Sequence, residues 1–288
     1  MRPRLIVCSL AAAFPALPAA ACDAKLEMLD PAIDIRPSPS FSEASSREQI
    51  RIRVANEGTT TCVLELELAL DPAFAGPFPT YSIVGPGGVI EFSAQTGSGV
   101  SAPAPLRMPI TLNAGVETTL EYAVAANVTW EMQAGSYDRR IDVALFDAAD
   151  GSRLDDAQVE LGVTVPLSSR IDFVGNVDRI DLGQLEFDRE NVSPPFGIRV
   201  YSTSTYNMEM DSENAGNLRQ EGGDALLPYA MSVSGQEINL ASGSQVIAGL
   251  GKSAETGDVY GVLVRVRPEH TTPAGRYSDR LTVTVTTY

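Results

Sequence analysis

Side chains on which most enzymes and nucleic-acid-binding proteins depend are scarce in this sequence. Its 288 residues include one histidine, one tryptophan and three cysteines, with 21 basic against 37 acidic residues. The histidine, His270, stands in a turn bounded by Pro268 and Pro273, and no serine–histidine–aspartate or cysteine–histidine set can be assembled around it. The net charge of −16 leaves no basic surface that could displace phosphate counterions, which argues against a nucleic-acid partner.

Motifs for phosphates and metal ions are also missing or incomplete. The run from Gly249 to Ser253 resembles the end of a phosphate-binding loop, but Val246 replaces the glycine that such a loop needs, which favours a hairpin turn. Residues 211–214 offer oxygen ligands without the spacing of a calcium loop, which is typical of a solvated turn. No pair of carboxylates stands out as the acid and base of a glycosidase. We expect no catalytic residue, metal ion or cofactor, and keep a secreted carbohydrate-active enzyme on a β-sandwich as a third hypothesis.

No apolar run is long enough to span a membrane comfortably, and the first one belongs to a targeting signal. Arg2 and Arg4 form its charged region, residues 5–14 its apolar region, and residues 19–21 a small-residue cleavage site. We expect residues 1–21 to be removed and a mature chain starting at Cys22 to be exported. A lipid anchor on Cys22 is the alternative, although Ala19 occupies the place where a lipobox has a large aliphatic residue.

Cysteine usage agrees with export. Cys8 leaves with the signal, so Cys22 and Cys62 are the two cysteines of the mature chain. In an oxidising compartment two such cysteines predict a disulfide rather than a metal site or a nucleophile. The bond would tie the opening strand to the strand that follows the turn at residues 56–58.

Alternating apolar and polar residues, separated by turns, run through the rest of the chain. In residues 62–70 leucine occupies every second position from 64, with Glu65 and Glu67 between. Such segments predict strands with one buried face. With 24 glycines, 19 prolines and few helical stretches, the sequence predicts an all-β chain of two immunoglobulin-like Greek-key β-sandwiches, residues 22–166 and 171–288, with a linker at 167–170.

Residues 71–109 differ in composition from the rest of the chain: they are rich in proline and glycine and include several aromatic residues. Long loops with exposed apolar residues are often binding elements. We therefore take Phe74, Phe78 and Tyr81 as candidate surface-binding residues. The alternative is that residues 81–84 and 89–92 form two short strands whose aromatic residues lie in the core.

An internal repeat relates the two halves. Residues 134–143 read Ala-Gly-Ser-Tyr-Asp-Arg-Arg-Ile-Asp-Val, and residues 274–283 read Ala-Gly-Arg-Tyr-Ser-Asp-Arg-Leu-Thr-Val. The first copy is followed by a further strand at 157–165, whereas only five residues follow the second. We expect the second sandwich to lack its last strand and to accept one from another chain. The pattern predicts an opening strand of this sandwich at residues 171–182, and the donor strand is expected to lie against it and against residues 276–288. The residues predicted to line the open groove are Tyr277, Leu281, Val283 and Val285.

The end of the sequence resembles a known family. Residues 275–285 read Gly-Arg-Tyr-Ser-Asp-Arg-Leu-Thr-Val-Thr-Val, and with residues 212–218, 227–231 and 259–261 they are similar to the spore coat protein U domain. The resemblance implies a subunit of an archaic chaperone–usher pilus at the cell surface. Its partners would be a periplasmic chaperone, an outer-membrane usher and the N-terminal donor strand of the next subunit.

Two-domain members of that family resemble tip adhesins, in which the first domain mediates attachment or biofilm formation. A mature chain that starts at Cys22 has no donor strand of its own, which also fits the tip of the fibre. We expect the terminal carboxylate of Tyr288 to anchor a basic residue of the chaperone. The alternative is a free-standing secreted or coat-type protein whose groove is closed by self-association. The target of the first domain is not predicted.

Overall fold

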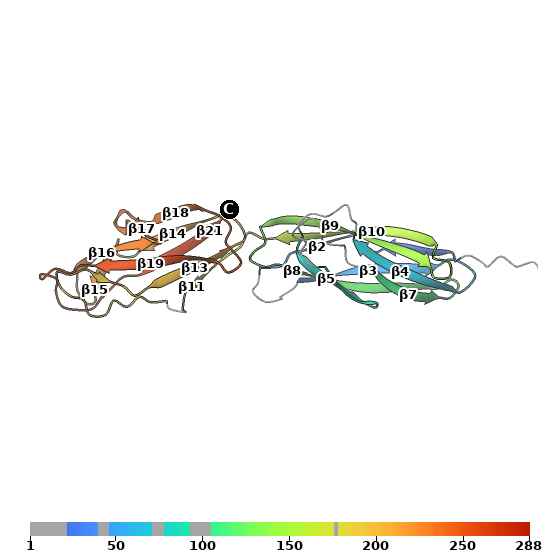
Figure 1. The fold of residues 1–288 in the computed structure, drawn as a ribbon, viewed down its shortest axis with the longest axis horizontal. Helices are drawn as coiled ribbons and strands as arrows, with labels where there is room; N and C mark the ends of the chain where they lie inside the picture. The colour runs from blue at the N-terminus through green and yellow to red at the C-terminus, as the bar shows by residue number, and fades with distance from the viewer. Residues whose placement is uncertain (1–21, 40–45, 71–77, 93–104, 176–177) are drawn as a thin grey trace, which may run out of the picture.

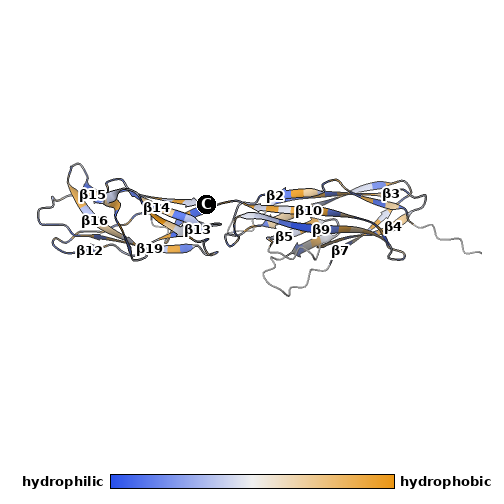
Figure 2. Ribbon diagram, turned by 90° about the horizontal axis from the view of Figure 1, so that it is seen from above, coloured by the Kyte–Doolittle hydropathy of each residue, from blue (hydrophilic) through white to orange (hydrophobic). Residues whose placement is uncertain are grey.

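The protein, in a computed structural model, is built from strands around two separate hydrophobic cores that lie end to end (Figure 1). The structure describes residues 22–39, 46–70, 78–92, 105–175 and 178–288. The predicted all-β architecture of immunoglobulin-like sandwiches is confirmed. Hydrophobic and hydrophilic residues alternate along many of the strands (Figure 2). The buried residues of this alternation form the two cores between the facing sheets.

Two five-stranded sheets make the first sandwich. One sheet has the order β1 (Ala24–Met28), β3 (Ser46–Asn56), β8 (Glu117–Asn127), β5 (Thr80–Gly85) and β6 (Gly88–Phe92). The other has the order β2 (Ala32–Ile35), β10 (Arg153–Val165), β9 (Gly135–Asp147), β4 (Cys62–Leu70) and β7 (Leu106–Leu112). The opening segment thus changes sheets between β1 and β2. Along β4, Leu64, Leu66 and Leu68 are buried, as their alternation predicted.

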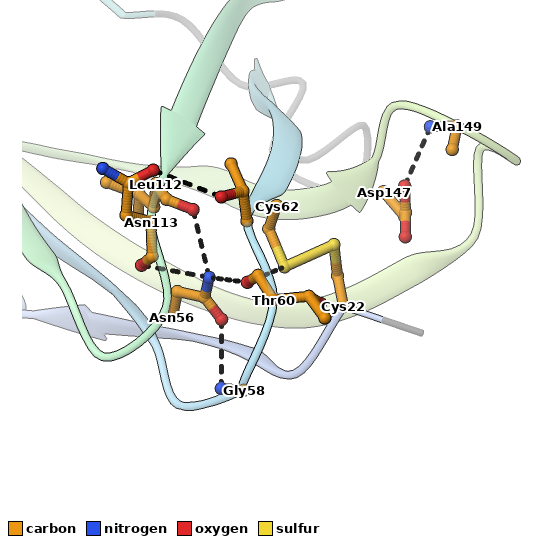
Figure 3. The surroundings of a disulfide bond; sticks show 10 residues. Cys22, Asn56, Gly58, Thr60, Cys62, Leu112, Asn113, Asp147 and Ala149 are labelled. Carbon is orange, nitrogen blue, oxygen red and sulfur yellow. Dashed lines mark hydrogen bonds between the residues drawn. A yellow bond between two sulfur atoms is a disulfide. The ribbon is translucent and has the colours of Figure 1, made fainter. Parts of the chain in front are cut away.

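The predicted disulfide joins Cys22 to Cys62, whose Cα atoms lie 5.5 Å apart (Figure 3). Beside it the buried side chain of Asn56 organises the turn. Its amide donates hydrogen bonds to the carbonyls of Thr60 at 2.8 Å and Leu112 at 3.1 Å. Cys22 is thus held to the first core by the disulfide, and the next residue, Asp23, by hydrogen bonds that its carbonyl accepts from the N–H groups of Glu57 and Gly58. A disulfide at this position agrees with an oxidising compartment.

The second sandwich consists of one large sheet and one small sheet. Its larger sheet has the order β11 (Ser169–Phe173), β13 (Phe196–Ser202), β19 (Asp258–Val266), β16 (Leu226–Val233), β15 (Asn217–Gln220) and β20 (Tyr277–Ser278). Short strands β12 (Asn191–Val192) and β17 (Gln236–Ile238) pair with β19 and β16, and a short 3₁₀ turn, η1 (Leu240–Ser242), follows β17. The facing sheet has the order β18 (Gln245–Leu250), β14 (Tyr206–Ser212) and β21 (Leu281–Thr287).

Two details differ from the sequence predictions. β11 begins at Ser169, so the strand takes in the last two residues predicted as linker. It ends at Phe173, whereas the pattern had suggested one strand to Leu182. The segment 71–109, where a binding loop was predicted, contains β5 and β6, paired antiparallel as the alternative interpretation had it.

Candidate strand-acceptor edge

The internal repeat has the same geometry in both sandwiches. The hydroxyl of Tyr137 donates to the carbonyl of Gln133, and that of Tyr277 donates to the carbonyl of Pro273, each at 2.7 Å. A tyrosine whose hydroxyl reaches back to the backbone a few residues upstream marks the start of the penultimate strand in immunoglobulin-like sandwiches. β9 and the pair β20–β21 are therefore equivalent strands.

The neighbour on one side of this strand is also equivalent. In the first sandwich β4 pairs with β9 so that Leu66 faces Leu145 and Leu68 faces Val143. In the second, β14 pairs with β21 so that Met208 faces Val285 and Met210 faces Val283. The register is the same, and β7 and β18 lie next in the two sheets.

The neighbour on the other side is where the sandwiches differ. β9 pairs with β10 from Gly135 to Phe146. Within the part of the chain that the structure describes, β21 pairs with β14 and with no second strand, so the sheet ends there. In Figure 1, β21 lies at the margin of its sheet and its end reaches the junction of the two halves.

This open edge leaves the apolar row of β21 incompletely covered. Ile141, Val143 and Leu145 of β9 are at most 1% exposed. Their counterparts Leu281, Val283 and Val285, together with Tyr277, pack against the second core but are only partly buried. Three of the four residues predicted to line the acceptor site thus lie along the unpaired edge of β21, whereas Tyr277 lies in β20, which pairs with β15 of the larger sheet.

The opposite margin is formed by β11, the edge strand of the larger sheet. Ile171 pairs with Val200 and Phe173 with Ile198, which places both side chains on the core face. Phe173 is nevertheless 37% exposed, and its ring lies 5.5 Å from that of Phe196. Both margins of the second sandwich therefore end in apolar residues that are not fully covered.

A second pair of related segments extends the comparison. In β2, Ile33 and Ile35 pair in parallel with Leu161 and Val163 of β10. After β11 the chain repeats the pattern Ile-Asp-aliphatic at residues 180–182, where Ile180 and Leu182 are half-buried against the second core. This segment forms no strand, and among the described residues no strand equivalent to β10 lies beside it. The sequence interpretation had included these residues in an opening strand at 171–182 that flanks the donor strand; the short repeat of residues 33–35 at 180–182 identifies the part that corresponds to β2.

The break between β20 and β21 is held by Asp279. Its carboxylate accepts hydrogen bonds from the hydroxyls of Ser212 and Tyr229, both at 2.6 Å, and from the backbone N–H of Asn214 at 3.1 Å. Burial, and then the bond to Asp279, raise the pKa of Tyr229 well above its usual range, so the phenol donates as a neutral group. The start of the acceptor edge is therefore fixed in place.

Tyr288, predicted as the chaperone anchor, follows β21 and is tied to the loop after β13. Its N–H donates to the carbonyl of Thr205 at 3.0 Å, and the Ser204 hydroxyl donates to the backbone oxygen of Tyr288 at 2.8 Å. The side chain is exposed. Its role as an anchor stays a prediction.

The prediction of a surface-binding role is wrong for two of its three residues. Phe78 and Tyr81 are 2% and 3% exposed, with ring centroids 5.2 Å apart. The guanidinium of Arg139 lies 5.0 Å from the centre of the Phe78 ring. Their apolar surface is used inside the first core, so they offer no contact to a ligand. Phe74 lies outside the described residues.

The remaining candidate chemistry is sparse. Among the described residues, no group of three or more histidine, cysteine, aspartate or glutamate side chains is placed to hold a metal ion. In the same ranges no helix has the length and apolar character needed to cross a membrane. His270 is exposed and pairs with Asp188 at 2.5 Å.

No family model and no curated protein sequence matches this chain. Among solved structures it is similar to the CsuC–CsuE chaperone–tip adhesion subunit pre-assembly complex of archaic chaperone–usher Csu pili from Acinetobacter baumannii. The identity is 14%, the TM-score 0.46, and the match covers 91% of this chain and 99% of that one. It is also similar to the CupB6 tip adhesin of Pseudomonas aeruginosa, with 10% identity, a TM-score of 0.39 and coverage of 92% and 95%. At these values neither likeness decides the function.

Proposed function

We propose that this chain is a non-enzymatic tip subunit of an archaic chaperone–usher pilus, assembled by donor-strand complementation of its second domain. One observation carries the proposal: β20 and β21 together have the tyrosine, the register and the apolar row of β9, but among the described residues no strand lies beside β21 as β10 lies beside β9. A strand supplied by another chain would complete the second sandwich as β10 completes the first.

The chemistry of the edge supports a strand as the ligand. An unpaired strand offers a row of backbone N–H and C=O groups, and apolar side chains next to it offer sites for alternate residues of an added strand. By analogy with β10, the incoming strand would run antiparallel to β21 and parallel to residues 180–182. It would bury Leu281, Val283 and Val285 on one side and Leu182 on the other.

The proposed partners follow from this site. A periplasmic chaperone would cover the edge during export, with a basic residue on the carboxylate of Tyr288, and an outer-membrane usher would exchange it for the donor strand of the next subunit. The similar CsuE subunit was captured with its chaperone. The first domain, whose β9 edge is already complete, would be free for attachment and biofilm formation.

The proposal can be tested by giving the chain its missing strand. Because Tyr288 is the counterpart of Ala148, a copy of residues 149–165 appended after Tyr288 would recreate the β9–β10 hairpin on β21. We expect this extension to slow amide exchange along β21 and to raise the melting temperature of the second domain by at least about 10 °C. The control extension has aspartate in place of the copied Val159, Leu161 and Val163.

Co-expression distinguishes the alternatives. Residues 22–288 should accumulate as a stable protein only with the chaperone from the same gene cluster or with the appended strand. Stable dimers of the unextended chain with a protected β21 would favour a self-associating coat or secreted protein. A stable monomer with a protected β21 would contradict both.

A further inference from the structure

Residues 128–134, a loop of the first sandwich, contact the second sandwich. Trp130 is 6% exposed, and its ring lies 5.7 Å from that of Tyr201 in the second sandwich. The N–H of Ala134 donates to the carbonyl of Thr203 at 2.7 Å, and the ammonium of Lys252 donates to the carbonyl of Glu131. The junction thus combines a buried aromatic ring with two hydrogen bonds between the sandwiches, one from backbone to backbone and one from a lysine side chain to a backbone carbonyl.

The receiving side of this junction is rigidly built. Thr203 is fully buried. Its N–H donates to the carbonyl of Ser168 at 3.0 Å, and its hydroxyl donates to that of Pro166 at 2.9 Å. The Thr203 carbonyl, which accepts the hydrogen bond from Ala134, is therefore fixed in place by the segment that connects the two sandwiches.

The same loop exists at the far end of the second sandwich. The repeat that aligns Ala134 with Ala274 and Tyr137 with Tyr277 also aligns Trp130 with His270. The equivalence is structural as well, because the tyrosine bonds of the two copies match. Residues 268–274 are mostly exposed in this structure, whereas their counterparts dock on a neighbour.

An aromatic platform stands beside this second loop. The ring of Phe187 stacks on His270 with centroids 5.7 Å apart, and His270 pairs with Asp188. Asn191 holds the turn at residues 186–191, which carries Phe187. Its side chain accepts a hydrogen bond from the N–H of Glu186 at 2.8 Å and donates one to the Glu186 carbonyl at 2.9 Å. Phe187 is 48% exposed despite these contacts. Aromatic residues, phenylalanine among them, are enriched at the centres of protein–protein interfaces.

We infer that Phe187, Asp188 and residues 268–274 form a docking surface for the body of the next β-sandwich. This inference rests on the proposed function. In the first sandwich the end of β10 lies beside the start of β9, where Val165 faces Gly135. The sandwich that follows β10 in the chain is the one that contacts Trp130. A donor strand that pairs with β21 in the same direction would end beside Tyr277, so the sandwich that follows the donor strand would lie against Phe187 and residues 268–274. The occupant would present an aromatic ring near the end of its strand equivalent to β13 and a backbone carbonyl directly after that strand, as Tyr201 and Thr203 do.

A three-sandwich chain tests the inference: residues 22–288 followed by a copy of residues 149–288. The copied β10 completes the second sandwich, and the copied second domain follows the natural linker. We expect amide exchange at residues 270–274 to be at least about tenfold slower than in the chain extended by residues 149–165 alone. Residues 130–134 of the natural junction serve as the internal reference.

Substitution identifies the contact. Phe187→Ser with His270→Ser should return exchange at residues 271–274 to the rate of the shorter extension, while β21 stays protected. The matched control is Val246→Ser, an exposed valine on β18. If β21 is protected but residues 270–274 exchange equally fast in both extended chains, the docking surface is refuted and the proposed function stands. If β21 itself stays unprotected, both are refuted.

Discussion

Val143 and Val283 occupy equivalent positions in the two sandwiches, yet Val143 is buried between two neighbouring strands and Val283 is half-buried beside one. The same residue type in the same register therefore has a different environment because of one strand. The contrast provides a matched pair of substitutions.

Val143→Ala should destabilise the first domain by about 2 kcal/mol, since it removes buried methyl groups and leaves a cavity. Val283→Ala should cost less than about 1 kcal/mol in the unextended chain, because part of its surface already faces water. Denaturant unfolding followed for each domain measures both values. In the chain extended by residues 149–165 the cost of Val283→Ala should rise towards that of Val143→Ala; equal costs with and without the extension would contradict an added strand on β21.

The disulfide should stabilise only the first domain. Cys22→Ser with Cys62→Ser opens a link between residues 40 apart in sequence, and loss of such a bond costs about 2–4 kcal/mol. Calorimetry should show a lower melting temperature for the first domain and an unchanged one for the second. The reduced wild-type chain serves as control and should behave like the double variant.

The fold and part of the candidate site could be predicted from the sequence. The clean alternation in β4 fixed its inward face, and the repeat at Tyr137 and Tyr277 pointed to the uneven strand count, because both signals are local. The role of Phe78 could not be predicted this way. An aromatic residue in a loop rich in proline and glycine has no periodicity, and only tertiary packing against Tyr81 and Arg139 places it in the core.

Asp279 should matter more than its partly exposed position suggests. Asp279→Ala leaves the hydroxyls of Ser212 and Tyr229 without their acceptor, and we expect a loss of about 2–4 kcal/mol in the second domain. Tyr229→Phe removes one of these bonds and should cost about 1 kcal/mol. Urea unfolding gives both values. Equal effects of the two substitutions would show that the carboxylate is not the centre of this network.

The first domain should lose stability at high pH through Tyr122. This residue is fully buried, and burial raises the pKa of its phenol to about 12. The unfolded chain ionises near pH 10 while the folded one keeps its proton, so the contribution is complete below pH 10 and is lost as the pH rises towards 12. The loss amounts to about 2–3 kcal/mol. Tyr122→Phe should unfold with a pH dependence shallower by about one proton in this range; an unchanged slope would contradict the assignment.

Leu182 provides the last test, because it ends the segment that was predicted to flank the donor strand on the side away from β21. Its counterpart Ile35 is fully buried beside β10, whereas Leu182 is half-buried with no strand next to it among the described residues. Leu182→Asp should therefore have a small effect on the unextended chain. In the chain extended by residues 149–165 it should remove most of the added thermal stability, since a carboxylate would face the appended strand without a partner. Leu167→Asp, at an exposed leucine of the connecting segment, is the control. Equal melting temperatures for the extended chain with and without Leu182→Asp would place the added strand on β21 alone and separate it from residues 180–182.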